Sequence, residues 1–326
     1  MRSIFTFGLL FLCAVSATAQ SGQVNFAELE KSVEAELKEN QTPGAAIAVI
    51  SGDRVLFVKG FGTTSAEGGA PNVTPDTLFR MGSTTKMFTA AALVTLAGAG
   101  KIKLDAPIGT HVKNLPPKLA SLTAHQLLSQ SANLRDFAAS VVTNDDAGLG
   151  QNVRSWKDDV FFTEPSSVYS YSSPGYWLAG FLVEEIYGKP YADALAELLF
   201  KPLGMTRSTI RPLAAMTYPL ALGHNIERGA ATVMRPVFNN AAMYPGGSMY
   251  SSASELSRFA IALMNDGRLE GRQALAPLVV AKLPAPQFPL PGADKAFYGY
   301  GLLGLRDARP ARRLARRCLA RLRFDH

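Results

Sequence analysis

Ser83 and Lys86 stand three residues apart at the start of an apolar segment, residues 83–96, whose residue types favour a helix. Side chains at this spacing share one helical face. Backbone N–H groups at a helix start can stabilise an oxyanion, and a lysine beside apolar neighbours such as Met87 and Ala90 can lose its proton and activate a hydroxyl. The pair can therefore form a covalent acyl intermediate. An ordinary capping serine beside a solvated lysine stays open as the alternative, because S-x-x-K alone is a weak motif.

The elements that must hold this pair begin with an amphipathic helix and a hairpin. Apolar residues recur at helical spacing within residues 26–38, and Pro43-Gly44 ends that pattern. Residues 45–50 and 55–59 are β-rich, and the Gly52-Asp53 turn between them predicts two antiparallel strands.

The remaining chain alternates helical patterns with loops rich in Pro and Gly. We predict an α+β fold: an antiparallel sheet flanked by helices, with an inserted helical region. The sheet part is expected over about 20–110 and 236–303, and the helical part over about 111–235. The clearest expected elements are helices at 176–187 and 191–200, a capped helix start at 251–255 and a strand-like run at 297–303.

The basic charge of the chain is concentrated at its C-terminal end. Of 33 basic and 26 acidic residues, eight Arg and two Asp lie in residues 304–326, which leaves 25 basic against 24 acidic elsewhere. We therefore expect no nucleic-acid partner, because the body offers no basic patch in sequence.

The first 19 residues predict a secretory signal peptide. Arg2 precedes an apolar stretch, and Ala17-Thr18-Ala19 matches a small-residue cleavage site. A membrane anchor is the alternative, although the stretch is short. We expect a periplasmic or secreted protein, whose processed form keeps Cys318 as its one cysteine.

A set of segments in the same order resembles the serine β-lactamase-related family, which includes class C β-lactamases, D-Ala-D-Ala carboxypeptidases and esterases. Residues 76–86 resemble its nucleophile segment, and residues 101–107 resemble the stretch that follows. Tyr171-Ser172-Ser173 resembles the second motif, Y-x-N. Residues 202–205, and Gly246-Gly247 with 251–253, match further blocks, so the resemblance covers about 26–303.

The resemblance implies a β-lactamase/transpeptidase-like fold and assigns roles to residues. Ser83 is the implied nucleophile, Lys86 its activating partner and Tyr171 the shared base, with a pKa lowered by the nearby lysine. A buried core tyrosine is the alternative for Tyr171. Ser173, Gly246 and Gly247 are the implied substrate-binding residues. Ser173 replaces the family's Asn, which favours an ester over an amide-bearing substrate.

The C-terminal end departs from the family. A third motif, K-T-G or H-x-G, is expected some tens of residues after residues 298–301, yet none occurs before His326. We interpret the Arg-rich residues 304–326 as the product of a frameshift near Leu303, with the last family strands missing. The alternative is a genuine amphipathic helix that contacts a membrane surface.

The sequence gives little support for a metal site. The histidines, at positions 111, 125, 224 and 326, have no metal-ligand spacing, so we expect neither a metal nor a cofactor. We predict an exported serine hydrolase that acts on a β-lactam, a D-amino-acid peptide or a small ester. A non-catalytic binding protein of the same family and a defective, truncated product are the alternatives.

Overall fold

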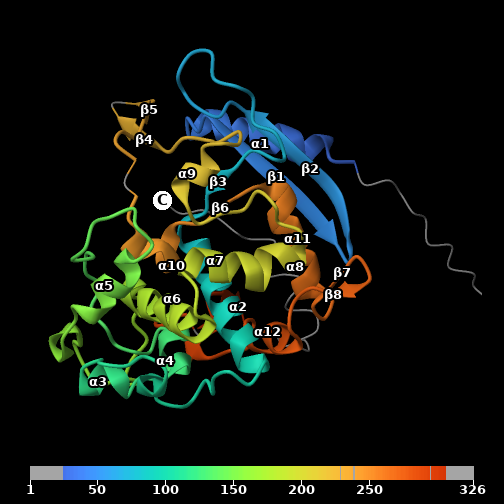
Figure 1. The fold of residues 1–326 in the computed structure, drawn as a ribbon. Coiled ribbons are helices and arrows are strands. Elements are labelled where there is room, and N and C mark those ends of the chain that lie inside the picture. The colour runs from blue at the N-terminus through green and yellow to red at the C-terminus, as the bar shows by residue number, and fades with distance from the viewer. Residues whose placement is uncertain (1–24, 228, 238, 294, 306–326) are drawn as a thin grey trace, which may run out of the picture.

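A computed structural model describes residues 25–227, 229–237, 239–293 and 295–305 (Figure 1). The predicted signal peptide, residues 1–19, lies outside the described residues. So does the Arg-rich segment from residue 306 onward. Among the described residues, no helix combines the length and the apolar character that crossing a bilayer requires.

The predicted hairpin is present and forms one edge of the molecule. Strand β1 (Gly44–Ser51) pairs antiparallel with β2 (Arg54–Gly62), with an irregularity in register at Val49/Ile50. Helix α1 (Ala27–Glu39) follows Phe26, whose ring stacks on Phe57 of β2 with centroids 4.8 Å apart. Helix α11 (Ala253–Met264) contacts both strands, and the Ser252 side chain caps it as predicted. Within the part of the chain that the structure describes, helices and no further strands thus hold the hairpin.

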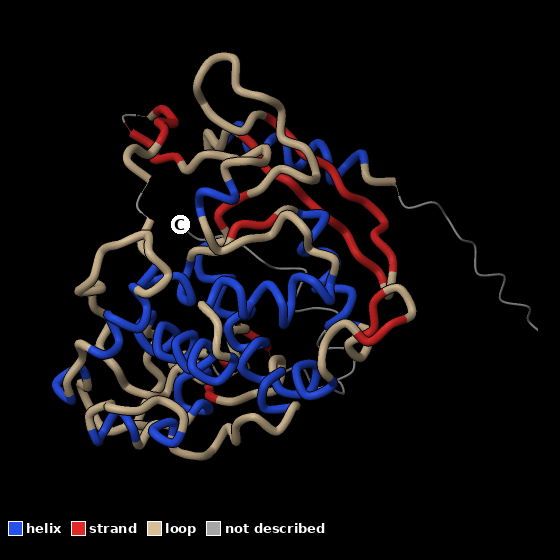
Figure 2. Tube along the Cα trace, in the orientation of Figure 1, coloured by secondary structure: helices blue, strands red, loops and turns tan. Residues whose placement is uncertain are grey.

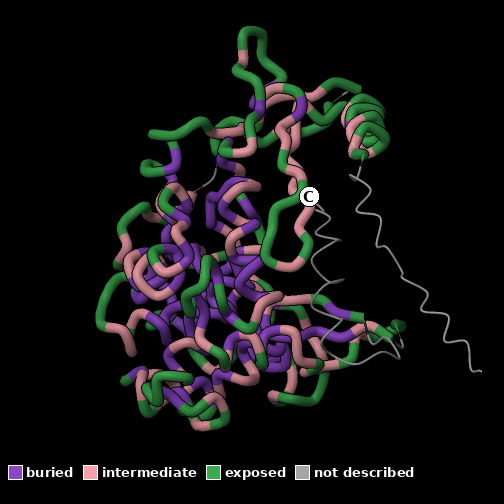
Figure 3. The backbone as a smooth tube through the Cα atoms, turned by 90° about the vertical axis from the view of Figure 1, so that its right-hand side faces the viewer, coloured by how far each residue is buried: buried purple, intermediate pink, exposed green. Residues whose placement is uncertain are grey.

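A central helix organises the rest of the fold. Helix α2 (Thr85–Gly98) buries eleven of its fourteen residues, so it is apolar on nearly every face and has to lie inside other helices. It contacts α6 (Ser173–Tyr187), α10 (Tyr244–Gly247) and α12 (Pro277–Lys282). Buried residues accordingly gather in this helical half of the molecule (Figure 3).

Shorter helices surround this core, and Figure 2 shows most of them below the two long strands. They are α3 (Pro117–Ala120), α4 (Ala124–Leu128), α5 (Gly148–Arg154), α7 (Tyr191–Leu195), α8 (Lys201–Leu203) and α9 (Pro212–Ala215), with 3₁₀ turns η1 (Gly82–Thr84), η2 (Ile108–Thr110), η3 (Asp158–Val160) and η5 (Ala241–Met243), and a π-helical turn η4 (Ala196–Phe200).

The remaining strands form small sheets, and all their pairings are antiparallel. The hairpin β4–β5 falls inside the range that we expected to be helical, 111–235. The strand-like run at 297–303 becomes β10 and the start of β11. The pairs are β3 (Phe79–Arg80) with β6 (Tyr250–Ser251), β4 (His224–Glu227) with β5 (Ala230–Val233), β7 (Arg268–Leu269) with β8 (Arg272–Gln273), and β10 (Ala296–Tyr298) with both β9 (Phe288–Pro289) and β11 (Leu303–Leu305).

Candidate active site

Ser83 lies on a short 3₁₀ turn, η1, that leads directly into α2. A backbone hydrogen bond from Met81 N–H to Met249 O, 2.8 Å long, ties the start of this turn to the residue that precedes β6. The Thr85 hydroxyl donates to Gly82 O (2.6 Å) and accepts from Met249 N–H (3.1 Å). The turn is therefore fixed on both sides, while Ser83 itself is exposed.

Lys86 lies one turn further into α2 and is buried, with 1% of its surface exposed. Its ammonium donates to Gly246 O (2.7 Å), to Ser83 Oγ (3.2 Å) and to Ser173 Oγ (3.5 Å). A lysine ammonium has three donors and no acceptor, so these three oxygens match its capacity. The alternative of a solvated lysine does not fit this arrangement.

Burial lowers the pKa of Lys86 from 10.5 to about 8, because removal from water disfavours the charged amine. The carboxylate of Asp136 acts in the opposite direction and raises this pKa. A pKa close to the working pH lets an amine act as a general base in an appreciable fraction of molecules.

Tyr171 covers the lysine from the outer side. The Lys86 Nζ atom lies 4.8 Å from the centre of the Tyr171 ring, within the range of cation–π contact. Tyr171 is 42% exposed, so it is not a buried core tyrosine. Our expectation of a lowered pKa is wrong: burial raises the pKa of Tyr171, whereas a hydrogen bond with Ser83 lowers it to a smaller extent.

The start of α6 brings Ser173 to the site. The Ser172 side chain caps this helix, and Ser172 N–H donates to Gln130 Oε1 (2.9 Å). Ser173 N–H donates to Asp136 Oδ1 at 3.1 Å, which places this carboxylate at the positive end of the helix. Ser173 Oγ accepts from Lys86, so the hydroxyl that replaces the family's amide is oriented toward the lysine.

The two predicted glycines differ in their contribution. Gly246 supplies the carbonyl that accepts from Lys86, and it needs to be glycine because a Cβ there would lie 2.7 Å from Trp177 Nε1. Gly247 instead packs beside Gly82, where a Cβ would lie 3.7 Å from the backbone. Gly247 thus adjoins the nucleophile turn without touching the lysine.

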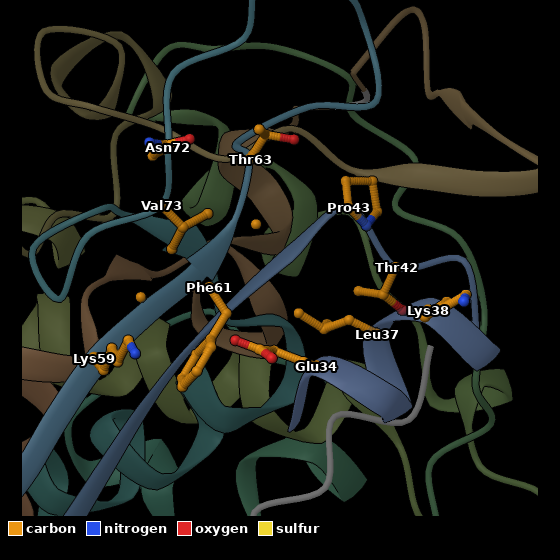
Figure 4. Close-up of a pocket in the computed structure, with 12 residues that line it drawn as sticks. Glu34, Leu37, Lys38, Thr42, Pro43, Lys59, Phe61, Thr63, Asn72 and Val73 are labelled. Carbon is orange, nitrogen blue, oxygen red and sulfur yellow. The ribbon is translucent and has the colours of Figure 1, made fainter. Parts of the chain in front are cut away.

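A surface hollow elsewhere in the molecule does not belong to this site. Its lining comes from α1, β2 and the loop after β2, and includes Glu34, Lys59 and Phe61 (Figure 4). His224 is also placed elsewhere, since its Nε2 accepts from Ala66 N–H at 2.9 Å. Neither feature contributes a group to Ser83 or Lys86.

Two residues at the site were not identified from the sequence. Asp136 accepts from Ser173 N–H at 3.1 Å, although it lies 37 residues away in the sequence. Tyr298 lies edge-to-face on Tyr171, with centroids 6.4 Å apart and planes at 86°. The aromatic run Tyr298-Gly299-Tyr300 was the available signal for Tyr298, whereas Asp136 lies far from the second motif in the sequence and had none.

The chain matches known proteins over most of its length. A family model described as Beta-lactamase matches residues 29–312. Penicillin-binding protein 4 of Amycolatopsis lactamdurans is 32% identical over 241 residues, which cover 70% of this chain and 61% of the relative. Protein flp of Staphylococcus aureus strain N315 is 26% identical over 218 residues, which cover 65% of this chain and 44% of the relative.

Solved structures show the same fold. An octameric penicillin-binding protein homologue from Pyrococcus abyssi gives a TM-score of 0.74 at 23% identity, over 87% of this chain and 66% of that one. A class C beta lactamase from Rhodobacter sphaeroides gives 0.69 at 24% identity, over 87% and 77%. The chain spans less than two thirds of the length of the curated relatives named above. The match over residues 29–312, together with this shared fold, places the chain in the beta-lactamase family, the serine β-lactamase-related group with penicillin-binding relatives.

Proposed function

We propose that this chain is an exported serine hydrolase that forms an acyl-enzyme on Ser83. One observation carries the proposal: an exposed serine hydroxyl lies 3.2 Å from a buried lysine amine whose pKa is lowered to about 8. This combination supplies a nucleophile that a substrate can reach and a base that can activate it.

The proposed reaction has two steps. The Ser83 oxygen bonds to the substrate carbonyl carbon while its proton passes to the neutral Lys86 amine. The bond to the leaving group then breaks, and that group takes up a proton. Tyr171 is protonated at neutral pH, because burial raises its pKa, so it is suited to donate this proton. In the second step water adds to the acyl carbon and gives one proton back to Tyr171, and the bond to Ser83 breaks as the Ser83 oxygen takes its proton back from Lys86.

We expect small esters to be the preferred substrates, with β-lactams and D-amino-acid peptides as the other members of the class. Ser173 bears a single hydroxyl, already engaged by Lys86, where the family pattern has an amide. A hydroxyl has fewer groups than an amide with which to hold an amide-bearing substrate. We therefore expect an ester to depend less than an amide on hydrogen bonds from the side chain at position 173.

The test is turnover and covalent labelling by the full chain. We expect the wild type to hydrolyse short acyl esters and Ser83→Ala to lose about 10³-fold or more of this rate, as for removal of a nucleophile that acts with its base. Chromogenic β-lactams and a D-Ala-D-Ala peptide are assayed in parallel to rank the substrate classes. Ser83→Ala is expected to keep its melting temperature, because the side chain is exposed.

Ser32→Ala is the matched control, since Ser32 is an exposed serine on α1 whose hydroxyl donates only to Glu28 O. Intact-mass measurement with a slow ester or β-lactam should show one acyl group on the wild type and on Ser32→Ala. Equal hydrolysis by the wild type and Ser83→Ala would overturn the assignment. Binding without any mass increase would favour a non-catalytic binding protein.

A further inference from the structure

The segment of residues 298–301 contacts the parts of the chain that carry the candidate site. Its Tyr298 ring packs edge-to-face on Tyr171. Its Tyr300 hydroxyl hydrogen-bonds His125 Nδ1 at 2.8 Å, on α4. Its Gly301 lies against α2, where a Cβ would be 2.6 Å from Met87 Cα and 2.8 Å from the Lys86 carbonyl carbon. The segment thus touches α2, α4 and the Tyr171 loop at once.

Tyr298 is itself held rigidly. It is 3% exposed, and its phenol hydrogen-bonds that of Tyr176. Tyr176 donates its own hydroxyl proton to Leu128 O (2.7 Å). Backbone hydrogen bonds from Gln287 N–H to Tyr298 O and from Tyr300 N–H to Leu283 O, each 3.0 Å long, fix the neighbouring chain.

Tyr171, in contrast, has little support on its outer side, because 42% of its surface is exposed. Its ring has to stay over Lys86 and close to Ser83 if its proton is to reach the reacting atoms. An edge-to-face neighbour restricts a ring to one orientation, and such pairs contribute about 0.5–1.5 kcal/mol beyond the area that they bury. Among the described ring contacts, Tyr298 is the aromatic neighbour of Tyr171.

We propose that Tyr298 is a positioning residue that holds the Tyr171 ring over Lys86 and Ser83. This inference rests on the proposed function for its consequence on rate, but the placement of the ring can be measured without any substrate. The aromatic ring of Tyr298 carries the effect, and its hydroxyl serves to anchor that ring on Tyr176.

Kinetics of the full chain test the effect on rate. Misplacing a reacting group by about 1 Å can cost about 100-fold, so we expect Tyr298→Leu to lower kcat on a short ester by about 10- to 100-fold, with KM nearly unchanged. Tyr298→Phe keeps the ring and should recover most of kcat. In a Tyr171→Phe background, Tyr298→Leu should cost little more, because two residues that act through one interaction are non-additive.

Phe57→Leu is the matched control, because it removes one ring of an aromatic pair, Phe26 with Phe57, in the hairpin instead of at the site. This variant should keep kcat close to that of the wild type. If Tyr298→Leu does not melt cooperatively, Tyr298→Met, which fills the space with a flexible side chain and no ring, replaces it in the same measurements. Full additivity of Tyr298→Leu with Tyr171→Phe would overturn the positioning role.

The second readout is the pH titration of Tyr171, followed by NMR of tyrosines labelled with ¹³C at the ring carbon that bears the hydroxyl. The Tyr171 resonance is assigned by its loss in Tyr171→Phe. We expect its titration to move toward the ordinary tyrosine value in Tyr298→Leu and to stay in place in Tyr298→Phe and Phe57→Leu. An unchanged Tyr171 titration in Tyr298→Leu would refute the proposal, even if the proposed hydrolase activity were absent. If the wild type hydrolyses no ester but the Tyr171 titration moves as expected in Tyr298→Leu, the proposed function is refuted and the positioning role of Tyr298 stands.

Discussion

The helical half around α2 and the β1–β2 hairpin differ in how far their apolar side chains are buried. Eleven of the fourteen residues of α2 are buried. On β2, by contrast, Val55, Leu56 and Val58 are 41%, 42% and 36% exposed. Because Lys86 belongs to the buried region, its lowered pKa is a property of tight helix packing (Figure 3). The candidate chemistry therefore depends first on the packing of the helices around α2.

The largest expected difference between the regions is in stability. Leu93→Ala removes a wholly buried side chain from α2 and should lower the free energy of unfolding by about 2–5 kcal/mol. Leu56→Ala makes the same chemical change at an exposed position of β2 and should cost below about 1 kcal/mol. Denaturant unfolding of both variants measures the two values. Equal losses would show that the hairpin is packed as tightly as the helical half.

A second pair of variants separates backbone conformation from close packing. Gly301 and Gly271 both have a positive φ, +73° and +77°. Alanine at Gly271, in the turn between β7 and β8, meets nothing within 4 Å and should cost about 1–2 kcal/mol. Alanine at Gly301 meets the α2 backbone as well, which should add about 1–3 kcal/mol.

Thermal unfolding and ester hydrolysis are the measurements for this pair. We expect Gly301→Ala to lower both stability and rate, because α2 has to move and Lys86 lies on it. Gly271→Ala should lower stability alone. If the two variants lose the same stability, the contact between the 298–301 segment and α2 is looser than described.

The smallest expected effect is a shift in pH dependence. The neutral amine of Lys86 is the active form, so kcat/KM should rise with pH through about 8 and then level off. Asp136 raises the pKa of Lys86, so Asp136→Asn should move the rise to lower pH. The shift should be below about one pH unit, because Asp136 is exposed to solvent.

Asparagine keeps the oxygen that accepts from Ser173 N–H, so this variant changes charge with little change in structure. Asp53→Asn, an exposed carboxylate in the hairpin turn, is the control and should leave the profile in place. A shift toward higher pH in Asp136→Asn would contradict the assignment of the titrating group to Lys86.

Much of the fold could be predicted from local sequence patterns. Alternating β-rich residues around Gly52-Asp53 predicted the hairpin, and the apolar run after Ser83 predicted α2 within two residues at each end. Both signals are local, because a turn type and an unbroken apolar segment depend on neighbouring residues only. The β4–β5 hairpin was missed, since its four-residue strands are too short to establish a period.

The candidate site was predictable where a motif marks it. Ser83, Lys86 and Tyr171 followed from the resemblance, and the structure brings all three together. Asp136 and Tyr298 reach the site from loops and strands distant in the sequence, so no spacing rule could identify them. The direction in which the Tyr171 pKa shifts was predicted wrongly for a related reason. Burial, which raises this pKa, depends on the whole fold, whereas a motif shows only that a lysine is near.

The hydrogen bonds of Lys86 have a consequence for how protons reach the interior. With 1% exposure, the amine has almost no contact with bulk water, and its three partners are the oxygens of Ser83, Ser173 and Gly246. The Gly246 carbonyl cannot relay a proton, because it only accepts. Exchange with solvent therefore passes through the two hydroxyls, of which Ser83 is exposed and Ser173 is half-buried. An acyl group on Ser83 would close the more exposed of the two routes, so the amine should exchange its proton more slowly while the covalent intermediate lasts.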